Sequence, residues 1–225
     1  MKQEGRHFDR LSANGVVMCR SLPLGLSLSK ARPFFYAVNM QLALSCHPDT
    51  PQSALSGITV AISPRRGACL SLSFRARGEV DAICWPGTQA RGEGPWTRAD
   101  ELWRHSCFEA FIAPVDDQGY REINLSTWGK WAGYRFSGYR ADMARADDVA
   151  LLAGKWRRLA ERAELHALIE LPPEYRRSDL MVGLSAVIEA KDGAKSYWAL
   201  RHPAGSPDFH HADCFAARIA APEAA

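Results

Sequence analysis

The sequence predicts an all-β protein, an antiparallel β-sandwich of about ten strands with little helix. Two observations predict this fold class. From Met40 onward, apolar and polar residues alternate in short runs such as "LSLSF" at residues 70–74, which is the period of a strand with one buried face. Turn-forming Gly, Pro, Asn and Asp separate these runs at short intervals, as in antiparallel sheets.

The expected strands follow one another along the chain. The first four cover "QLALSC", "ITVAI", "CLSLSFR" and "EVDAICW", and "SPRRGA" connects the second and third as a hairpin. After the Gly/Pro-rich loop at 86–98 come "WRHSCFEAFIAP", "YREINLS" and "WAGYRFSGYR". Residues 149–163 stay ambiguous, because their apolar residues recur at helical spacing while the run could also lead into the next strand. The last strands expected are "ELHALIEL", "LMVGLSAVIEA", "KSYWALRH" and "CFAARIA".

Residues 1–39 differ from the rest of the chain. They lack sustained alternation and are interrupted by Ser, Gly and Pro. Phrases such as "FDRLSANG" resemble translated intergenic repeats of some bacterial genomes. We therefore expect residues 1–39 to be a disordered or spurious extension, with the natural start at Met40 and one domain over 40–225. The alternative is a short ordered N-terminal arm.

The charge distribution argues against nucleic-acid and membrane partners. The formal net charge is +3, but residues 1–39 hold six of the 28 Lys/Arg and two of the 25 acids. Residues 40–225 therefore carry 22 basic and 23 acidic residues, so they offer no basic surface for nucleic acid or anionic lipid. The six cysteines form no CxxC pair, which favours a reduced, cytoplasmic setting, and no apolar run is long enough to span a membrane.

Candidate binding residues gather on three expected strands and one turn. Alternation places Trp103, His105 and Glu109 on one face of their strand, and it groups Glu122 with Asn124 on the next. Carboxylates and amides beside tryptophan suit a polyol, whose hydroxyls form hydrogen bonds while its C–H face stacks on indole. The candidate ligand-binding residues are Trp103, His105, Glu109, Glu122, Asn124, Trp128, Trp131, Trp198 and His202.

Each candidate has a structural alternative. Glu109 and Glu122 could face water on the solvated side of a sheet, and Trp103 and Trp198 could belong to the core. Trp128 and Trp131 flank Gly129 in a turn, a poor place to bury two indoles, which favours contact with a ligand or partner.

No metal site is expected. The best metal-ligand candidate is the run "DFHHADC", which holds Asp208, His210, His211 and Asp213. Adjacent histidines on a strand point to opposite faces, so a structural role is favoured over metal binding. The chain also lacks GxGxxG after a strand, GxxxxGK[ST], GxSxG and HExxH, so no standard catalytic motif is present.

Three blocks resemble a known family. "LWRHSCFEAFIAP", "YREINLSTWGKWAGYRFSGYR" and "SYWALRHPAGSPDFHHADCF" are similar to bacterial DOMON-like domain proteins, relatives of the family 9 carbohydrate-binding modules, over roughly residues 40–220. The resemblance implies a β-sandwich of about ten strands with a site for sugar or haem. In the carbohydrate modules two tryptophans sandwich a sugar, and the candidates are Trp103, Trp128, Trp131 and Trp198. Haem-binding relatives use a Met/His pair, whereas Met143 and Met181 lie in no recognisable ligand context here.

We therefore expect a non-catalytic module that binds a carbohydrate or sugar-like small molecule. Three alternatives remain open. The first is a haem-binding DOMON-type domain. The second is a hydrolase or isomerase with Glu109 and Glu122 as its acid/base pair, and the third is an interaction scaffold that docks a protein through the Trp128/Trp131 turn.

Overall fold

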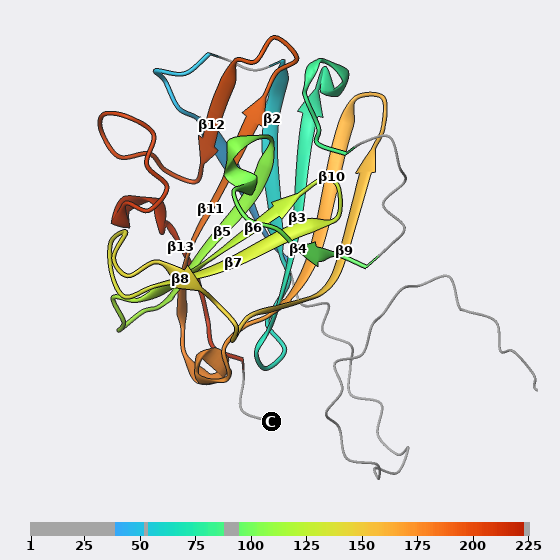
Figure 1. Ribbon diagram of the computed structural model, residues 1–225. Coiled ribbons are helices and arrows are strands. Elements are labelled where there is room, and N and C mark those ends of the chain that lie inside the picture. The colour runs from blue at the N-terminus through green and yellow to red at the C-terminus, as the bar shows by residue number, and fades with distance from the viewer. Residues whose placement is uncertain (1–38, 52–53, 88–94, 223–225) are drawn as a thin grey trace, which may run out of the picture. The chain divides into compact units, whose positions relative to one another are not determined.

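The computed structural model describes residues 39–51, 54–87 and 95–222. They contain thirteen β-strands and four short 3₁₀ helices, with no α-helix in this part of the chain (Figure 1). The strands are β1 (Met40–Cys46), β2 (Leu55–Ile62), β3 (Cys69–Gly78), β4 (Thr97–Arg98), β5 (Cys107–Pro114), β6 (Tyr120–Ser126), β7 (Lys130–Phe136), β8 (Ala144–Arg145), β9 (Ala150–Arg158), β10 (Arg162–Glu170), β11 (Leu180–Glu189), β12 (Lys195–Ala199) and β13 (Ala217–Ile219). The 3₁₀ helices are η1 (Val80–Ala82), η2 (Leu102–Arg104), η3 (Pro173–Arg177) and η4 (Ala212–Cys214).

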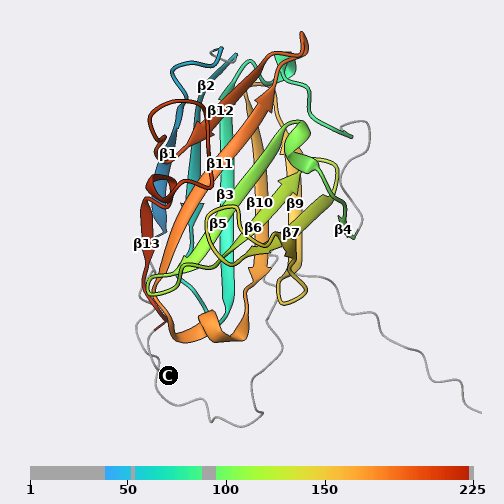
Figure 2. The ribbon, with the colours of Figure 1, turned by 60° about the vertical axis from the view of Figure 1, so that its left-hand side comes forward.

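The strands form one hydrogen-bonded path in the order β4-β7-β6-β5-β11-β12-β1-β2-β3-β10-β9, with β13 beside β11 and β8 beside β7. Strand β1 joins the two halves of this path. It pairs with β2 from Met40 to Leu44 and with β12 at Ser45 and Cys46. The sheet is therefore a continuous, curled one (Figures 1 and 2). It differs from the expected ten-strand sandwich in having thirteen strands and in the pairing of β1 with both halves.

The core lies between the two halves of the curled sheet. Strand β3 contributes Leu70, Leu72 and Phe74, all fully buried, as the alternation of its sequence predicted. The Phe74 ring meets Phe108 of β5 from the opposite half, with ring centroids 5.1 Å apart. Burying each such side chain contributes roughly 1.5–3 kcal/mol, so this core holds the two halves face to face.

Three expectations about local structure change. The ambiguous segment 149–163 contains no helix: residues 150–158 form β9, which pairs with β10, and residues 159–161 connect the two strands. The run "EVDAICW" is not a strand, since it forms η1, and the Trp85 Nε1–H donates back to the Val80 carbonyl at 2.8 Å. The strand expected from Trp103 begins only at Cys107, because η2 and its left-handed N-cap, Glu101 (φ 60°), precede it.

Two expectations concern the N-terminal segment and membrane crossing. The expected extension at 1–39 lies outside them apart from Asn39, and it stays a prediction. Among the described residues, no helix has the length and apolar character that a membrane crossing needs.

Candidate functional site

A second apolar cluster covers the face of β5, β6, β7, β11 and β12 that points away from the core. It arises from the same alternation as the core, because every second residue of these strands points outward. Phe209 joins the cluster from the segment 201–211, here called the capping loop, which follows β12. This face is therefore covered in part by a loop, which leaves room for a pocket between loop and sheet.

That pocket has a volume of about 340 Å³. Its lining comes from the sheet, from η2, from the capping loop and from the loop 137–143 between β7 and β8. The lining residues are Trp103, Glu109, Phe111, Glu122, Phe136, Arg140, Met143, Val187, Tyr197, Pro207, Phe209 and His210. Three of the predicted site residues, Trp103, Glu109 and Glu122, thus share one cavity.

Two buried carboxyl groups form part of its floor. Glu109 is 2% exposed and Glu122 is 5% exposed. Glu109 stands opposite Asn124 of β6 and opposite Ser185 of β11. The Ser185 hydroxyl donates to Glu109 Oε2 at 3.3 Å, and the Asn124 side-chain amide donates to Glu122 Oε1 at 2.8 Å. Asn124, a predicted site residue, is therefore bonded to Glu122 and is the cross-strand neighbour of Glu109.

Two acceptor atoms in this cluster have no hydrogen-bond partner among the described residues. They are Glu109 Oε1 and Asn124 Oδ1, and both are buried. Since buried polar atoms are nearly always hydrogen-bonded, these two cross-strand neighbours need a donor, which a proton on Glu109 or a bound group can supply.

Burial also changes the protonation of both acids. It raises the pKa of Glu109 well above its ordinary value, and the charge of Glu122 raises it further. Burial raises the pKa of Glu122 to about 7, against the opposing effects of the Asn124 hydrogen bond and the charge of Arg140. Like charges in one dry site cannot both ionise easily, so the pair retains protons near neutral pH.

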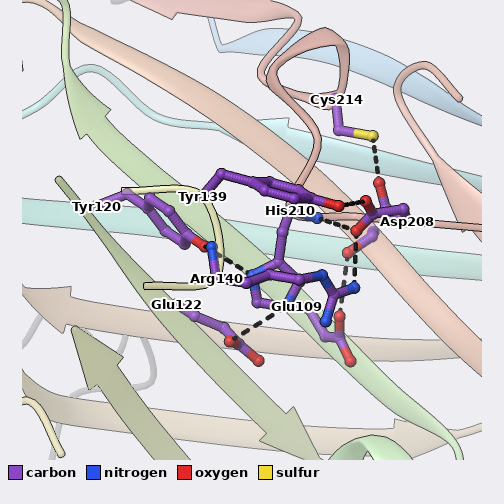
Figure 3. A network of polar contacts seen from close by, with 9 residues as sticks. Glu109, Tyr120, Glu122, Tyr139, Arg140, Asp208, His210 and Cys214 are labelled. Atoms are coloured by element: carbon purple, nitrogen blue, oxygen red, sulfur yellow. Dashed lines mark hydrogen bonds and ion pairs between the residues drawn. The ribbon is translucent and has the colours of Figure 1, made fainter. Parts of the chain in front are cut away.

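A polar network fixes the capping loop beside the pocket (Figure 3). Arg140 Nη2 and the Tyr139 hydroxyl donate to the two carboxylate oxygens of Asp208, at 2.7 and 2.6 Å. The His210 backbone N–H donates to Asp208 at 3.1 Å, and His210 Nδ1 lies 2.8 Å from the Tyr120 hydroxyl. Burial, with the nearby charge of Arg140, lowers the pKa of His210 to about 4. At neutral pH this histidine is therefore uncharged.

Backbone strain is concentrated around the same pocket. In the described residues, the non-glycine positions with positive φ are Glu101 (60°), Arg140 (52°) and Asp142 (51°). Such angles are unfavourable for residues with a Cβ and tend to occur where function needs a particular geometry. Glu101 precedes η2, which carries Trp103, and the other two lie in the 137–143 loop.

The remaining predicted tryptophans lie elsewhere. Trp131 and Trp198 are 6% and 5% exposed and belong to the core between the sheet halves. The expectation of an exposed Trp131 is wrong, because the turn ends at Gly129 and β7 carries the indole inward, where Arg98 stacks on it at 4.1 Å. Trp128 is 50% exposed, as expected for a turn, but it does not line this pocket.

The two predicted histidines lie outside the pocket lining as well. His105 Nδ1 pairs with Glu189 at 2.7 Å on an exposed surface. His202 Nε2 donates to the Ser45 carbonyl at 2.8 Å, and its ring meets His47 edge-on at 4.8 Å. Both therefore have local structural partners.

Other features of the site were missed or left open by the sequence. Arg140, Tyr197 and Phe209 were not singled out, and no local pattern marks them. His210 belongs to the run considered for metal binding; among the described residues, no group of three His, Cys, Asp or Glu is arranged to hold a metal ion. Met143 lines the pocket, whereas Met181 lines a separate groove beside Tyr139 and Phe215.

Comparisons with known proteins find the fold but no family. No family model matches the chain, and neither does any curated protein. A crystal structure of a candidate carbohydrate-binding protein from Bacteroides uniformis is similar over 78% of this chain and 84% of its own, with 13% identity and a TM-score of 0.53. A family 9 carbohydrate-binding module from Caldicellulosiruptor kristjanssonii in complex with glucose matches over 81% and 86%, with 10% identity and a TM-score of 0.46.

Proposed function

We propose that this chain is a binding module for a carbohydrate or similar polyol, and that the pocket between sheet and capping loop is its site. One observation carries the proposal: a half-buried indole, Trp103, shares a cavity with the buried carboxyl groups of Glu109 and Glu122. An apolar surface for C–H groups beside acceptors for hydroxyls is what a sugar requires.

The surroundings of Trp103 support this role. Tyr134 contacts its ring edge-on at a centroid distance of 5.7 Å, and the Tyr134 hydroxyl donates to Asp100 at 2.7 Å. The indole is therefore held by a partner that is itself anchored. A preorganised aromatic surface loses little side-chain entropy on binding.

The shared fold gives independent support, since the Bacteroides uniformis protein is a candidate carbohydrate-binding protein. We extend the proposal to a non-catalytic, DOMON-like domain in a cytoplasmic setting. Haem remains the second ligand class of that resemblance, with Met143 as the methionine at the pocket.

Tryptophan fluorescence tests the proposal. The protein is titrated with a panel of mono- and disaccharides, and saturable quenching or enhancement is expected. Trp103→Phe should greatly weaken the affinity measured by isothermal titration calorimetry, because phenylalanine offers a smaller face; calorimetry is used for the variants because the substitution also removes the reporting indole. Trp128→Phe, which removes an indole outside the pocket, should bind like the parent. Saturable binding that survives Trp103→Phe and disappears with Trp128→Phe would place the site in the turn instead.

A further inference from the structure

We propose that the ligand of this pocket is a protonated amino sugar, or a polyhydroxylated amine of the same chemistry, whose ammonium group contacts Glu109 and Glu122. The inference rests on the proposed function and names the class of carbohydrate. The sugar ring lies against Trp103, and its ammonium group points to the pocket floor.

Several oxygen atoms of the described residues in and beside the pocket floor lack hydrogen-bond donors. Glu109 Oε1 and Asn124 Oδ1 have no partner among the described residues. Glu122 Oε2 has only His210 Nε2 at 3.9 Å, which is too long for a hydrogen bond. Among the described residues, each of the two carboxyl groups that line the pocket thus has an oxygen without a side-chain hydrogen bond. An ammonium group presents three N–H donors and no acceptor, so it matches this set better than a hydroxyl does.

The strand register explains why the acceptors converge. Glu109 and Asn124 are direct cross-strand neighbours, and side chains of such a pair lie about 4.5–5.5 Å apart at Cβ. Glu122 lies two residues before Asn124 on the same face of β6. The Asn124 side-chain amide donates a hydrogen bond to Glu122. Glu109 and Glu122 both line the pocket, so one donor group in the pocket can approach both carboxyl groups, while Asn124 holds Glu122 from behind.

The two carboxyl groups also have no available positive charge beside them among the described residues. Arg140 is the cation among the lining residues, but Asp208 engages its guanidinium at 2.7 Å. His210 is neutral at neutral pH, because burial lowers its pKa to about 4. Among the described residues, the other titratable groups near the two carboxyls carry no positive charge; they are Cys107 on β5, Tyr120 on β6, Tyr134 on β7 and Tyr197 on β12. A cationic ligand therefore supplies the positive partner that the two carboxyl groups lack.

Binding by this route exchanges a proton for the ligand. In the free protein, burial raises the pKa of both carboxyl groups, so the pair retains protons. When the ammonium group binds, a carboxyl group releases its proton to solvent and its oxygens accept N–H hydrogen bonds. The carboxyl O–H bond ionises and the buffer takes up the proton; no other covalent bond forms or breaks. A neutral sugar places no positive charge on the carboxyls, so its binding leaves the proton in place.

Isothermal titration calorimetry with glucosamine, glucose and N-acetylglucosamine tests the inference. At about pH 6.5, where amines are protonated, glucosamine should bind about ten-fold or more tightly than either neutral sugar. Comparing buffers of different ionisation enthalpy should show release of up to about one proton per glucosamine bound, and none for glucose.

Variants assign the effect to the floor. Glu109→Gln and Glu122→Gln should remove the preference for glucosamine and the proton release. Glu164→Gln is the matched control: Glu164 is also buried, but it lies on β10 and pairs with Arg75 at 3.0 Å. Circular dichroism checks that each variant is folded.

The outcomes separate this inference from the proposed function. Equal affinities for glucosamine and glucose, without proton release, would overturn the amino-sugar inference and leave carbohydrate binding intact. Failure of every sugar in the panel to bind would overturn both.

Discussion

Replacing Glu122 by Gln is expected to stabilise the protein above neutral pH. Burial raises the pKa of Glu122 from 4.5 to about 7 in the folded protein. At about 1.4 kcal/mol per pKa unit, this corresponds to about 3 kcal/mol. The folded state binds the Glu122 proton more tightly than the unfolded state, so the stabilising contribution is fully present below pH 4.5. It is lost as the pH rises through about 7.

Urea unfolding of the parent and Glu122→Gln between about pH 5 and about pH 8 measures this contribution. Gln has no proton to lose and keeps an oxygen that can accept the Asn124 hydrogen bond, which is 2.8 Å in the parent. The free energy of unfolding of the variant minus that of the parent should therefore grow with pH, by up to about 3 kcal/mol.

The comparison uses the free energy of unfolding of the variant minus that of the parent, because His210 contributes a pH dependence of the opposite sign to each protein. Burial lowers its folded pKa from 6.5 to about 4. The folded state then binds fewer protons than the unfolded state in that range, so stability rises with pH. Its causes are burial, Arg140 and Asp208, which the variant keeps, so most of this contribution cancels in the difference. A difference that stays constant from about pH 5 to about pH 8 would refute the assigned burial of the Glu122 charge.

Two further substitutions test the core and the capping loop. Trp198→Ala should lower the free energy of unfolding by about 3–5 kcal/mol in urea titrations, because the indole lies in the core; a change below about 1 kcal/mol would place it at the surface. Asp208→Asn should change global stability by less than about 1 kcal/mol, since Arg140 is half-exposed. It should nevertheless speed amide hydrogen exchange in the capping loop, and unchanged exchange would show that the network of Figure 3 does not hold the loop.

The sequence predicted the features of this protein that depend on strand alternation. Glu122 and Asn124 share a face of β6 because side chains two residues apart always do. That relation follows from local geometry alone, so it holds whatever the arrangement of the neighbouring strands. The grouping of Glu109 with Trp103 and His105 by the same rule fails, because β5 begins only at Cys107.

Alternation does not say which face of a strand meets the core. Trp198 and Tyr197 are neighbours on β12, and either could have pointed inward; the structure buries Trp198 in the core and brings Tyr197 to the pocket. Likewise, the inward direction of Trp131 depends on where the turn at Gly129 (φ 76°) ends. The partners Arg140 and Asp208 lie 68 residues apart in sequence, and no local pattern connects them.

The unfavourable features of this fold coincide with its pocket, which is an argument for function in itself. Packing alone would favour apolar residues at the positions of Glu109 and Glu122, because a buried acid must lose hydration or hold a proton. The strained backbone at Glu101 and Arg140 serves no visible purpose in the core between the sheet halves. Yet the two buried acids and Arg140 line one cavity, and Glu101 precedes the helix η2 that carries Trp103 to it. Where local rules are broken together at one place, the compensating gain is expected there too. We infer that this gain is the binding of the proposed ligand, which supplies donors and positive charge.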